Sequence, residues 1–113
     1  MDQEIPVKGR KYDQDKPRYD LYPLDAYEGC TKVLSFGAQK YSDNEWKNVP
    51  NAKSRYYAAL IRHLNAQKEH FDSGGTGLLL DEESGLPHLD HAQCCLIFIR
   101  HITNAEKTIT KQQ

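Results

Sequence analysis

Apolar side chains recur every three or four residues along three stretches of the chain, which is the spacing of amphipathic helices. The first stretch covers residues 23–41 and opens with Pro23, a residue suited to the first turn of a helix. The second covers about residues 52–72 and follows Asn51, which is suited to cap it. The third covers about residues 86–106 and is apolar on more than half of its circumference. The pattern predicts an all-α fold, a small bundle of three long helices with the third at its centre.

Each of the first two helices has an apolar stripe that is expected to face the core. The stripe of the first consists of Leu24, Tyr27, Thr31, Leu34, Ala38 and Tyr41. The stripe of the second consists of Tyr56, Leu60, His63, Leu64, Gln67 and Phe71. A short element is expected around residues 43–50, and Gly37 is a point where the first helix can end or bend. Because one short chain would struggle to cover so much apolar surface, we expect a homo-oligomer, a dimer or a tetramer.

The two ends of the chain lack helical periodicity. Residues 1–22 form an irregular arm that carries five basic and two acidic residues between Lys8 and Arg18. Such an arm can wrap over an anion, although a solvated terminus is the simpler interpretation. Residues 107–113 form a polar tail. We therefore expect one helical domain over residues 1–113.

The composition narrows the class of protein. With 113 residues, of which 38% are hydrophobic and 27% charged, the chain is long enough for one globular core. A net charge of −1 argues against nucleic-acid binding through overall positive charge. The three cysteines form no even framework, which indicates a reducing cytoplasm. The longest apolar run, at residues 94–99, is too short to span a membrane, and no signal segment is visible.

Histidines and carboxylates are concentrated between residues 62 and 91, which hold four of the five histidines and six of the sixteen acidic residues. Three of these histidines fall on expected helix faces, His88 and His91 one turn apart on the third helix and His63 on the second. The pair Glu69 and Asp72 has the same spacing near the end of the second helix. These five residues are the candidate ligands of a divalent cation.

Two considerations weaken that ligand set. On an unbroken helix Asp72 lies about 180° and Glu69 about 120° from His63, so the three cannot face one ion unless the helix unwinds after Glu69. Histidines and carboxylates at helix ends are also often solvated caps. Glu28 has two interpretations, a partner of the helix dipole or a further inward carboxylate of the same site.

Basic and aromatic side chains outside this segment suit a nucleotide. The candidate phosphate-binding residues are Lys11, Lys16, Arg18, Lys40 and Arg62. Tyr41 and Trp46 can stack on a base. An aromatic side chain in such a loop can equally serve as a lid over the core.

Four segments together carry a family resemblance: KYDQDKPRYDLYP (11–23), FGAQKY to NEW (36–46), RHL (62–64) and DEESGLPHLDHA (81–92). They resemble a phage-encoded family of dATP/dGTP diphosphohydrolases, small MazG-like proteins of the all-α NTP pyrophosphohydrolase type. The resemblance covers nearly the whole chain. It implies Mg²⁺- or Mn²⁺-dependent cleavage of a purine deoxynucleoside triphosphate to the monophosphate and pyrophosphate, in phage nucleotide metabolism.

The resemblance also has a point of departure. MazG-like proteins carry a Glu-x-x-Glu pair on one helix and Glu-x-x-Asp on the next, whereas only Glu69 and Asp72 match here and the next helix offers His88 and His91. Because imidazole ligands favour transition metals, we expect Mn²⁺ or another transition metal ahead of Mg²⁺. Within that chemistry Glu83 or Glu82 would orient the attacking water as general base.

Two other functions fit the same residues. A non-catalytic nucleotide-binding protein would sequester its ligand with the basic arm and the aromatic loop. A structural helical dimer would use its histidines for packing only. Product analysis with a panel of nucleotides separates the three, because only the enzyme releases pyrophosphate.

Overall fold

A computed structural model describes residues 9–110 of the chain, so the first eight residues of the arm and the last three of the tail lie outside it. The described part is helical, with elements in the order η1 (Tyr19–Leu21), α1 (Leu24–Lys40), η2 (Glu45–Asn48), α2 (Ala52–Asp72) and α3 (His88–Thr103). Within residues 9–110 no strand forms, and β-type pairing is limited to an isolated antiparallel bridge between Leu80 and Pro87. The predicted all-α bundle of three long helices is confirmed. No helix in this part of the chain has the length and apolar character to cross a membrane.

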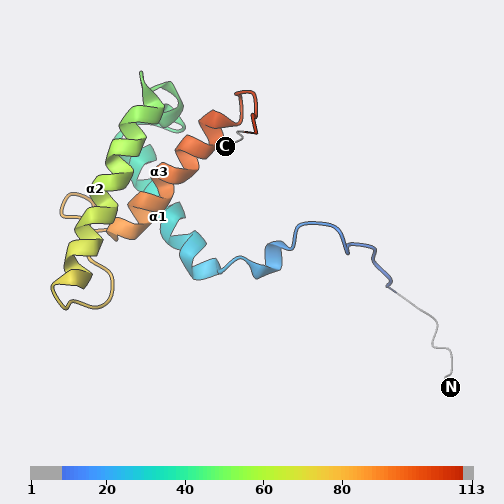
Figure 1. Ribbon diagram of the computed structural model, residues 1–113, viewed down its shortest axis with the longest axis horizontal. Helices are drawn as coiled ribbons and strands as arrows, with labels where there is room; N and C mark the ends of the chain where they lie inside the picture. Colours follow the sequence, from blue (N-terminus) through green and yellow to red (C-terminus); the bar gives the residue numbers. More distant parts are fainter. Residues whose placement is uncertain (1–8, 111–113) are drawn as a thin grey trace.

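The third helix is central, as predicted. It lies antiparallel beside α2 and also packs against α1, while the arm leads away from the helices (Figure 1). It begins at His88, because Pro87 is extended at ψ 138°, and it ends at Thr103, so both ends lie inside the predicted limits. Helix α1 runs through Gly37 to Lys40 without ending there. Asn51 precedes α2 in the left-handed conformation, at φ 54°, and its side chain does not cap the helix, which corrects that prediction.

Small residues make the contact between α1 and α3. Cys30 and Val33 of α1 are buried against Cys94 of α3, and Leu86 and Phe98 pack on this cluster. A β-carbon at Gly29 would collide with the carboxylate of Asp90, so the two helices approach closely at that level. The α1 stripe predicted from the larger side chains is therefore wrong, since the buried line runs through the small residues between them. Much of that stripe stays exposed, namely Leu24, Tyr27, Thr31, Leu34 and Tyr41.

Helix α2 buries part of its predicted stripe. Tyr56, Leu60 and His63 are half-buried and Gln67 is fully buried, at 1% exposure. The other two stripe residues, Leu64 and Phe71, are exposed because they lie to the side of the contact with α3. The burial of an amide in place of these larger apolar groups is explained by its hydrogen bonds to the loop that follows α2.

Three aromatic side chains, Trp46, Tyr56 and Phe98, pack together at the end of the helix pair formed by the start of α2 and the end of α3. The indole of Trp46 stacks on Phe98 with ring centroids 4.1 Å apart and an interplanar angle of 15°. Tyr56 tilts against the same phenyl ring at 4.9 Å and donates its hydroxyl hydrogen to the carbonyl oxygen of Trp46. The short helix η2 is thus fixed to the bundle, and Trp46 covers the core.

Candidate metal centre

The loop between α2 and α3 is folded back on the helices that it joins. Helix α2 stops at Asp72 because Gly74 takes up a left-handed conformation, at φ 92°. The amide of Gln67 then reaches the loop from the helix, donating to the carbonyl oxygen of Gly77 and accepting from the backbone N–H of Leu79, both at 2.9 Å. The loop is therefore anchored on a buried side chain of α2.

Further along, the loop closes on itself before α3. The backbone N–H of Asp81 donates to the carbonyl oxygen of Leu86, and that of His88 donates to Leu79. Gly85, at φ 73°, allows the tight turn between these pairs. This turn carries the side chain of Asp81 back to the beginning of α3, next to α2.

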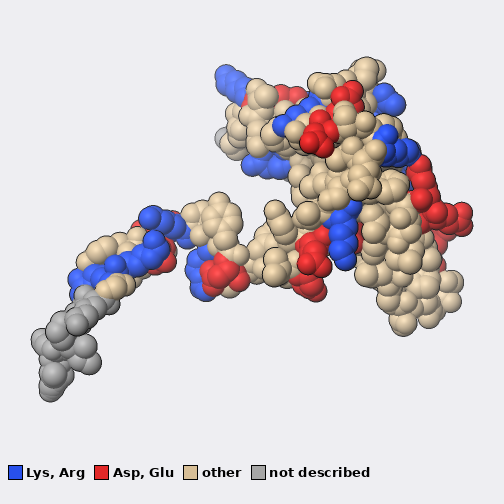
Figure 2. Space-filling model, turned by 180° about the vertical axis from the view of Figure 1, so that it is seen from behind, with Lys and Arg blue, Asp and Glu red and all other residues tan. Residues whose placement is uncertain are grey.

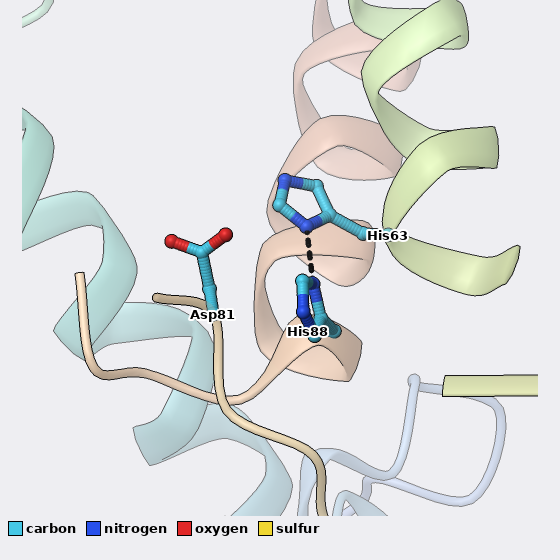
Figure 3. A group of neighbouring side chains, drawn as sticks. All are labelled: His63, Asp81 and His88. Atoms are coloured by element: carbon cyan, nitrogen blue, oxygen red, sulfur yellow. Dashed lines mark hydrogen bonds between the residues drawn. The ribbon is translucent and has the colours of Figure 1, made fainter. Parts of the chain in front are cut away.

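Three side chains meet at that point, His63 from the middle of α2, Asp81 from the loop and His88 from the first turn of α3 (Figure 3). One donor atom from each lies within 4.8 Å of the others. The two Nδ1 atoms of the histidines are 2.8 Å apart. Two nitrogens at this distance either share one hydrogen or direct their lone pairs toward a common cation.

A hydroxyl group links this cluster to His91. The Oγ atom of Ser84 lies 2.7 Å from Nε2 of His91 and 3.2 Å from Oδ2 of Asp81, and it accepts the backbone N–H of Leu86. All three contacts are satisfied when the hydroxyl donates to the carboxylate, which leaves Nε2 of His91 as a second donor to Oγ. The ring of His91 also stacks on that of His63, with centroids 4.6 Å apart.

The protonation states suit a cation. Burial, together with the neighbouring histidines His91 and His88, lowers the pKa of His63 to about 4, so its imidazole is neutral with a free lone pair. Burial alone would raise the pKa of Asp81, but two hydrogen bonds from Ser84 and the nearby imidazoles outweigh it and lower the pKa. The carboxyl group is therefore ionised. Neutral imidazole and ionised carboxylate are the forms that bind metals.

The donor set itself fits a divalent ion. Two imidazole nitrogens and one carboxylate oxygen are ligands common to Mn²⁺, Zn²⁺ and related transition metals, whereas Mg²⁺ prefers oxygen alone. All three candidate ligand residues are half-buried, which limits the access of solvent without closing it. The ligand set is bound to the fold from both sides, because α2 and α3 hold the histidines and the hydrogen-bonded turn holds Asp81.

The predicted ligands divide into two groups. His63 and His88 meet, and His91 lies beside them as a stacking partner of His63. Glu69 and Asp72 are exposed and outside the cluster, and Asp72 pairs with Lys68 at 2.6 Å. Because α2 continues without unwinding to Asp72, the angular conflict between these residues and His63 holds. The prediction that they share an ion with His63 is corrected for that reason.

Glu28 also lies outside the cluster. Its carboxylate is exposed on α1, where Oε1 is 3.8 Å from the ammonium group of Lys32 one turn later. The interpretation as an inward ligand is therefore not supported by the placement of the side chain.

The candidate catalytic carboxylates follow Asp81 on the turn. Glu82 and Glu83 are both exposed, and Glu83 forms an ion pair with Lys40 at the end of α1. This hydrogen bond raises the pKa of Lys40, which stays charged. A predicted phosphate-binding cation and a predicted general base thus stand together near the cluster.

The other predicted substrate residues are more scattered. Arg62 is exposed beside His63, and its charge contributes to the lowered pKa of that ring. Tyr41 is exposed, with the Lys40 ammonium 5.2 Å from its ring centroid. One face of Trp46 is occupied by Phe98, which favours the interpretation as a lid over the core, and stacking of its other face on a base stays a prediction.

The basic arm lies away from the cluster. Residues 9–23 are all exposed, and Figure 2 shows their Lys and Arg side chains on a segment that projects from the helices. Lys11 and Lys16 are exposed there, and Arg18 pairs with Asp20 at 2.6 Å. The arm is tied to the bundle near its root, where Gln93 donates to the hydroxyl of Tyr22.

Asp81 of the cluster and its hydrogen-bond partner Ser84 were not singled out from the sequence as a ligand and its partner. A signal for both exists, because an aspartate accepts the backbone N–H of a serine three residues later in a turn that contains glycine. The hairpin-like closure at Leu80 and Pro87 then determines which side chain returns to α3.

The fold and the site define a small all-α protein with a cluster of two histidines and a carboxylate between two antiparallel helices. Comparison with known sequences gives the family. The profile described as "dATP/dGTP diphosphohydrolase, N-terminal" matches residues 6–112, so the chain belongs to this family. The resemblance drawn from the four sequence segments is confirmed.

A curated relative has the same name. The "dATP/dGTP diphosphohydrolase" of Salmonella phage PMBT28 is 30% identical to the chain over 102 residues, which cover 90% of this chain and 32% of that protein. The chain thus spans about a third of the length of the relative that it matches. No solved structure matches the chain significantly.

Proposed function

We propose that the chain takes part in the metal-dependent hydrolysis of purine deoxynucleoside triphosphates, dATP and dGTP, to the monophosphate and pyrophosphate. The observation that carries this proposal is the cluster of His63, Asp81 and His88, in a chain whose family is named for that reaction. Its biological setting would be the nucleotide pool of a phage-infected cell, because the curated relative is a phage protein.

The residues of the cluster would hold the ion. A divalent metal bound there would neutralise phosphate charge and lower the pKa of a water molecule. Water attacks the α-phosphorus, the bond to the bridging oxygen breaks, and pyrophosphate leaves. The transition state gathers negative charge on the phosphate oxygens, so fixed positive groups nearby stabilise it.

The chain supplies such groups and a proton acceptor close to the cluster. Arg62 lies on α2 beside His63, and Lys40 reaches the turn from the end of α1. Glu82 and Glu83 stand on the exposed part of the same turn, where either carboxylate can accept the proton of the attacking water. When a phosphate takes the place of Glu83 beside Lys40, that carboxylate becomes available as a base.

A direct experiment compares metal binding and turnover in matched variants. His63→Ala and His88→Ala should abolish Mn²⁺ binding in calorimetry and release of pyrophosphate from dGTP. Glu69→Ala serves as the control, because Glu69 is a carboxylate of α2 that lies outside the cluster. Equal loss in the control and the histidine variants would contradict the proposed ligand set.

Product analysis with the wild-type protein distinguishes an enzyme from a nucleotide-binding protein. Incubation with dATP, dGTP, dCTP and TTP in the presence of Mn²⁺ or Mg²⁺ should yield monophosphate and pyrophosphate from the purine nucleotides. Stoichiometric nucleotide binding without products would instead identify a sequestering protein. A protein that neither binds the nucleotides nor releases products would contradict the proposal.

We also propose that the chain forms a homo-oligomer. Large apolar side chains remain exposed on the helices, among them Tyr57, Leu64 and Phe71 on α2 and Leu96 on α3. Exposed apolar side chains of this size on two neighbouring helices are typical of a surface that a partner covers. Sedimentation should show a species larger than the monomer at micromolar concentration, and a monomer alone would contradict the proposal.

A further inference from the structure

An open groove of about 320 Å³ lies between α1 and the turn that follows Asp81. Its apolar wall is formed by Phe36 of α1 and Leu86 of the loop, both half-buried. Its polar rim includes Glu28, Lys32 and Gln39 of α1, and Ser84 closes the side nearest to the cluster. The carboxylate of Glu28 lies 3.8 Å from the ammonium group of Lys32. The groove is thus distinct from the cluster, and Ser84 lies between them because its hydroxyl also hydrogen-bonds Asp81.

Only a few polar groups of the rim have hydrogen-bond donors that are not already used within the protein. The hydroxyl groups of Thr31 and Ser35 donate to carbonyl oxygens of their own helix, so their hydrogens are already used. Within residues 9–110 the side-chain amide of Gln39 has no hydrogen-bond partner. A ligand in the groove would therefore meet an apolar surface, one free amide and the ion pair of Glu28 and Lys32.

Ser84 connects the groove to the cluster. Its side chain lines the groove, and its Oγ atom contacts Asp81 and Nε2 of His91. Lys40, the residue after Gln39, extends to Glu83 on the same turn. A molecule seated on Phe36 and Leu86 would accordingly have one end beside the cluster and beside the ion pair of Lys40 and Glu83.

We propose that this groove binds the purine base of the nucleotide, with Gln39 as the residue that distinguishes purines from pyrimidines. The inference rests on the proposed nucleotide substrate. Ligand pockets commonly measure about 300–1,000 Å³, so a groove at the lower end accommodates a nucleoside but not a whole triphosphate. The phosphates then extend past Ser84 toward the cluster.

The chemistry of the rim matches the edge of a purine. Both adenine and guanine present the acceptor N7, which pyrimidines lack, and the amide of Gln39 can donate to it. The amide oxygen can also accept the amino group of adenine, while the ammonium of Lys32 can donate to O6 of guanine. Phe36 and Leu86 supply the flat apolar contact for the ring. Two purine bases with different second contacts are the expected ligands of such a rim.

The test measures base recognition apart from hydrolysis. For dGTP, dATP and dCTP, Gln39→Leu should raise KM for the purine nucleotides about tenfold, leave kcat nearly unchanged and reduce the preference over dCTP. Phe36→Ala should raise KM for all nucleotides. Asn65→Leu, a change of an exposed amide on α2, is the matched control and should leave KM unchanged.

Binding of deoxyguanosine, measured by equilibrium dialysis with a chelator present, provides the readout that needs neither metal nor phosphate. Gln39→Leu should weaken this binding by the same factor as it raises KM. If the wild-type protein hydrolyses dGTP but Gln39→Leu keeps the wild-type KM and purine preference, the groove is not the base site. If the wild-type protein hydrolyses none of the nucleotides, the proposed activity is wrong, and the binding of deoxyguanosine then tests the groove by itself. The groove is rejected if the wild-type protein does not bind deoxyguanosine, or if Gln39→Leu binds it as tightly as the wild type.

Discussion

Replacement of Gln67 by leucine should destabilise the protein strongly, although the side chains are similar in volume. The amide of Gln67 is 1% exposed and forms two hydrogen bonds of 2.9 Å with the loop backbone. Leucine would leave the carbonyl oxygen of Gly77 and the N–H of Leu79 without these partners. Leu79 is half-buried, whereas water can reach the carbonyl oxygen of the exposed Gly77. An unpaired buried group costs about 1–3 kcal/mol, so we expect a loss of about 1–3 kcal/mol in the free energy of unfolding.

Urea unfolding followed by circular dichroism measures this loss, and a domain of this size should show a Tm lower by roughly 4–12 °C. Hydrogen exchange should accelerate at the N–H of Leu79. Asn65→Leu, on the exposed face of the same helix, is the control and should change the stability by less than about 0.5 kcal/mol. Gln67→Glu should recover part of its stability in acid, where the protonated carboxyl can again donate to Gly77. Wild-type stability and unchanged exchange in Gln67→Leu would refute the role assigned to the amide.

Three further predictions concern other parts of the molecule. The pKa of His63 is lowered to about 4 in the folded protein, so its contribution to stability is complete above the unfolded pKa of 6.5 and is lost as the pH falls from 6.5 toward 4. In urea unfolding with a chelator present, His63→Gln should therefore lose less stability between about pH 7 and pH 5 than the wild type. Gly29→Ala should destabilise by about 1–3 kcal/mol in thermal unfolding, because the added methyl group meets the carboxylate of Asp90, and an unchanged Tm would show that this side chain moves aside freely. The double change Lys16→Ala with Arg18→Ala should weaken triphosphate binding about tenfold or more in calorimetry if the arm closes over the ligand, whereas unchanged affinity would identify a solvated arm.

The helices of this protein were predictable because their periodicity is long and regular. The buried faces were harder to predict, since hydrophobicity favoured Leu24, Tyr27 and Leu64 over the small residues Gly29 and Cys30. What decides the packing is how closely α1 can approach α3, and this depends on the residues that have little or no side chain. Large apolar residues that the single chain leaves exposed gave the same periodic signal as core residues.

The candidate site was predictable to a similar degree. His63 and His88 could be found because each lies on the inner face of its helix, and two antiparallel neighbours bring such faces together. Asp81 was missed as a ligand, because the turn with Ser84 does not by itself say where the carboxylate lies. Its place beside α3 depends on the hydrogen bonds between the Gln67 side chain and the loop backbone and on the bridge between Leu80 and Pro87. Helical periodicity contains no signal for such contacts.

The continuity of the cluster in sequence has a consequence for the order of folding. All three residues come from the segment that runs from α2 through the loop to α3, and α1 contributes none of them. A helical hairpin has contacts of short sequence separation, which form fast and at low entropic cost. We expect α2 and α3 to associate first and α1 to dock afterwards through Cys30 and Val33. An ion that binds the early hairpin would then act as a folding nucleus before the groove on α1 exists.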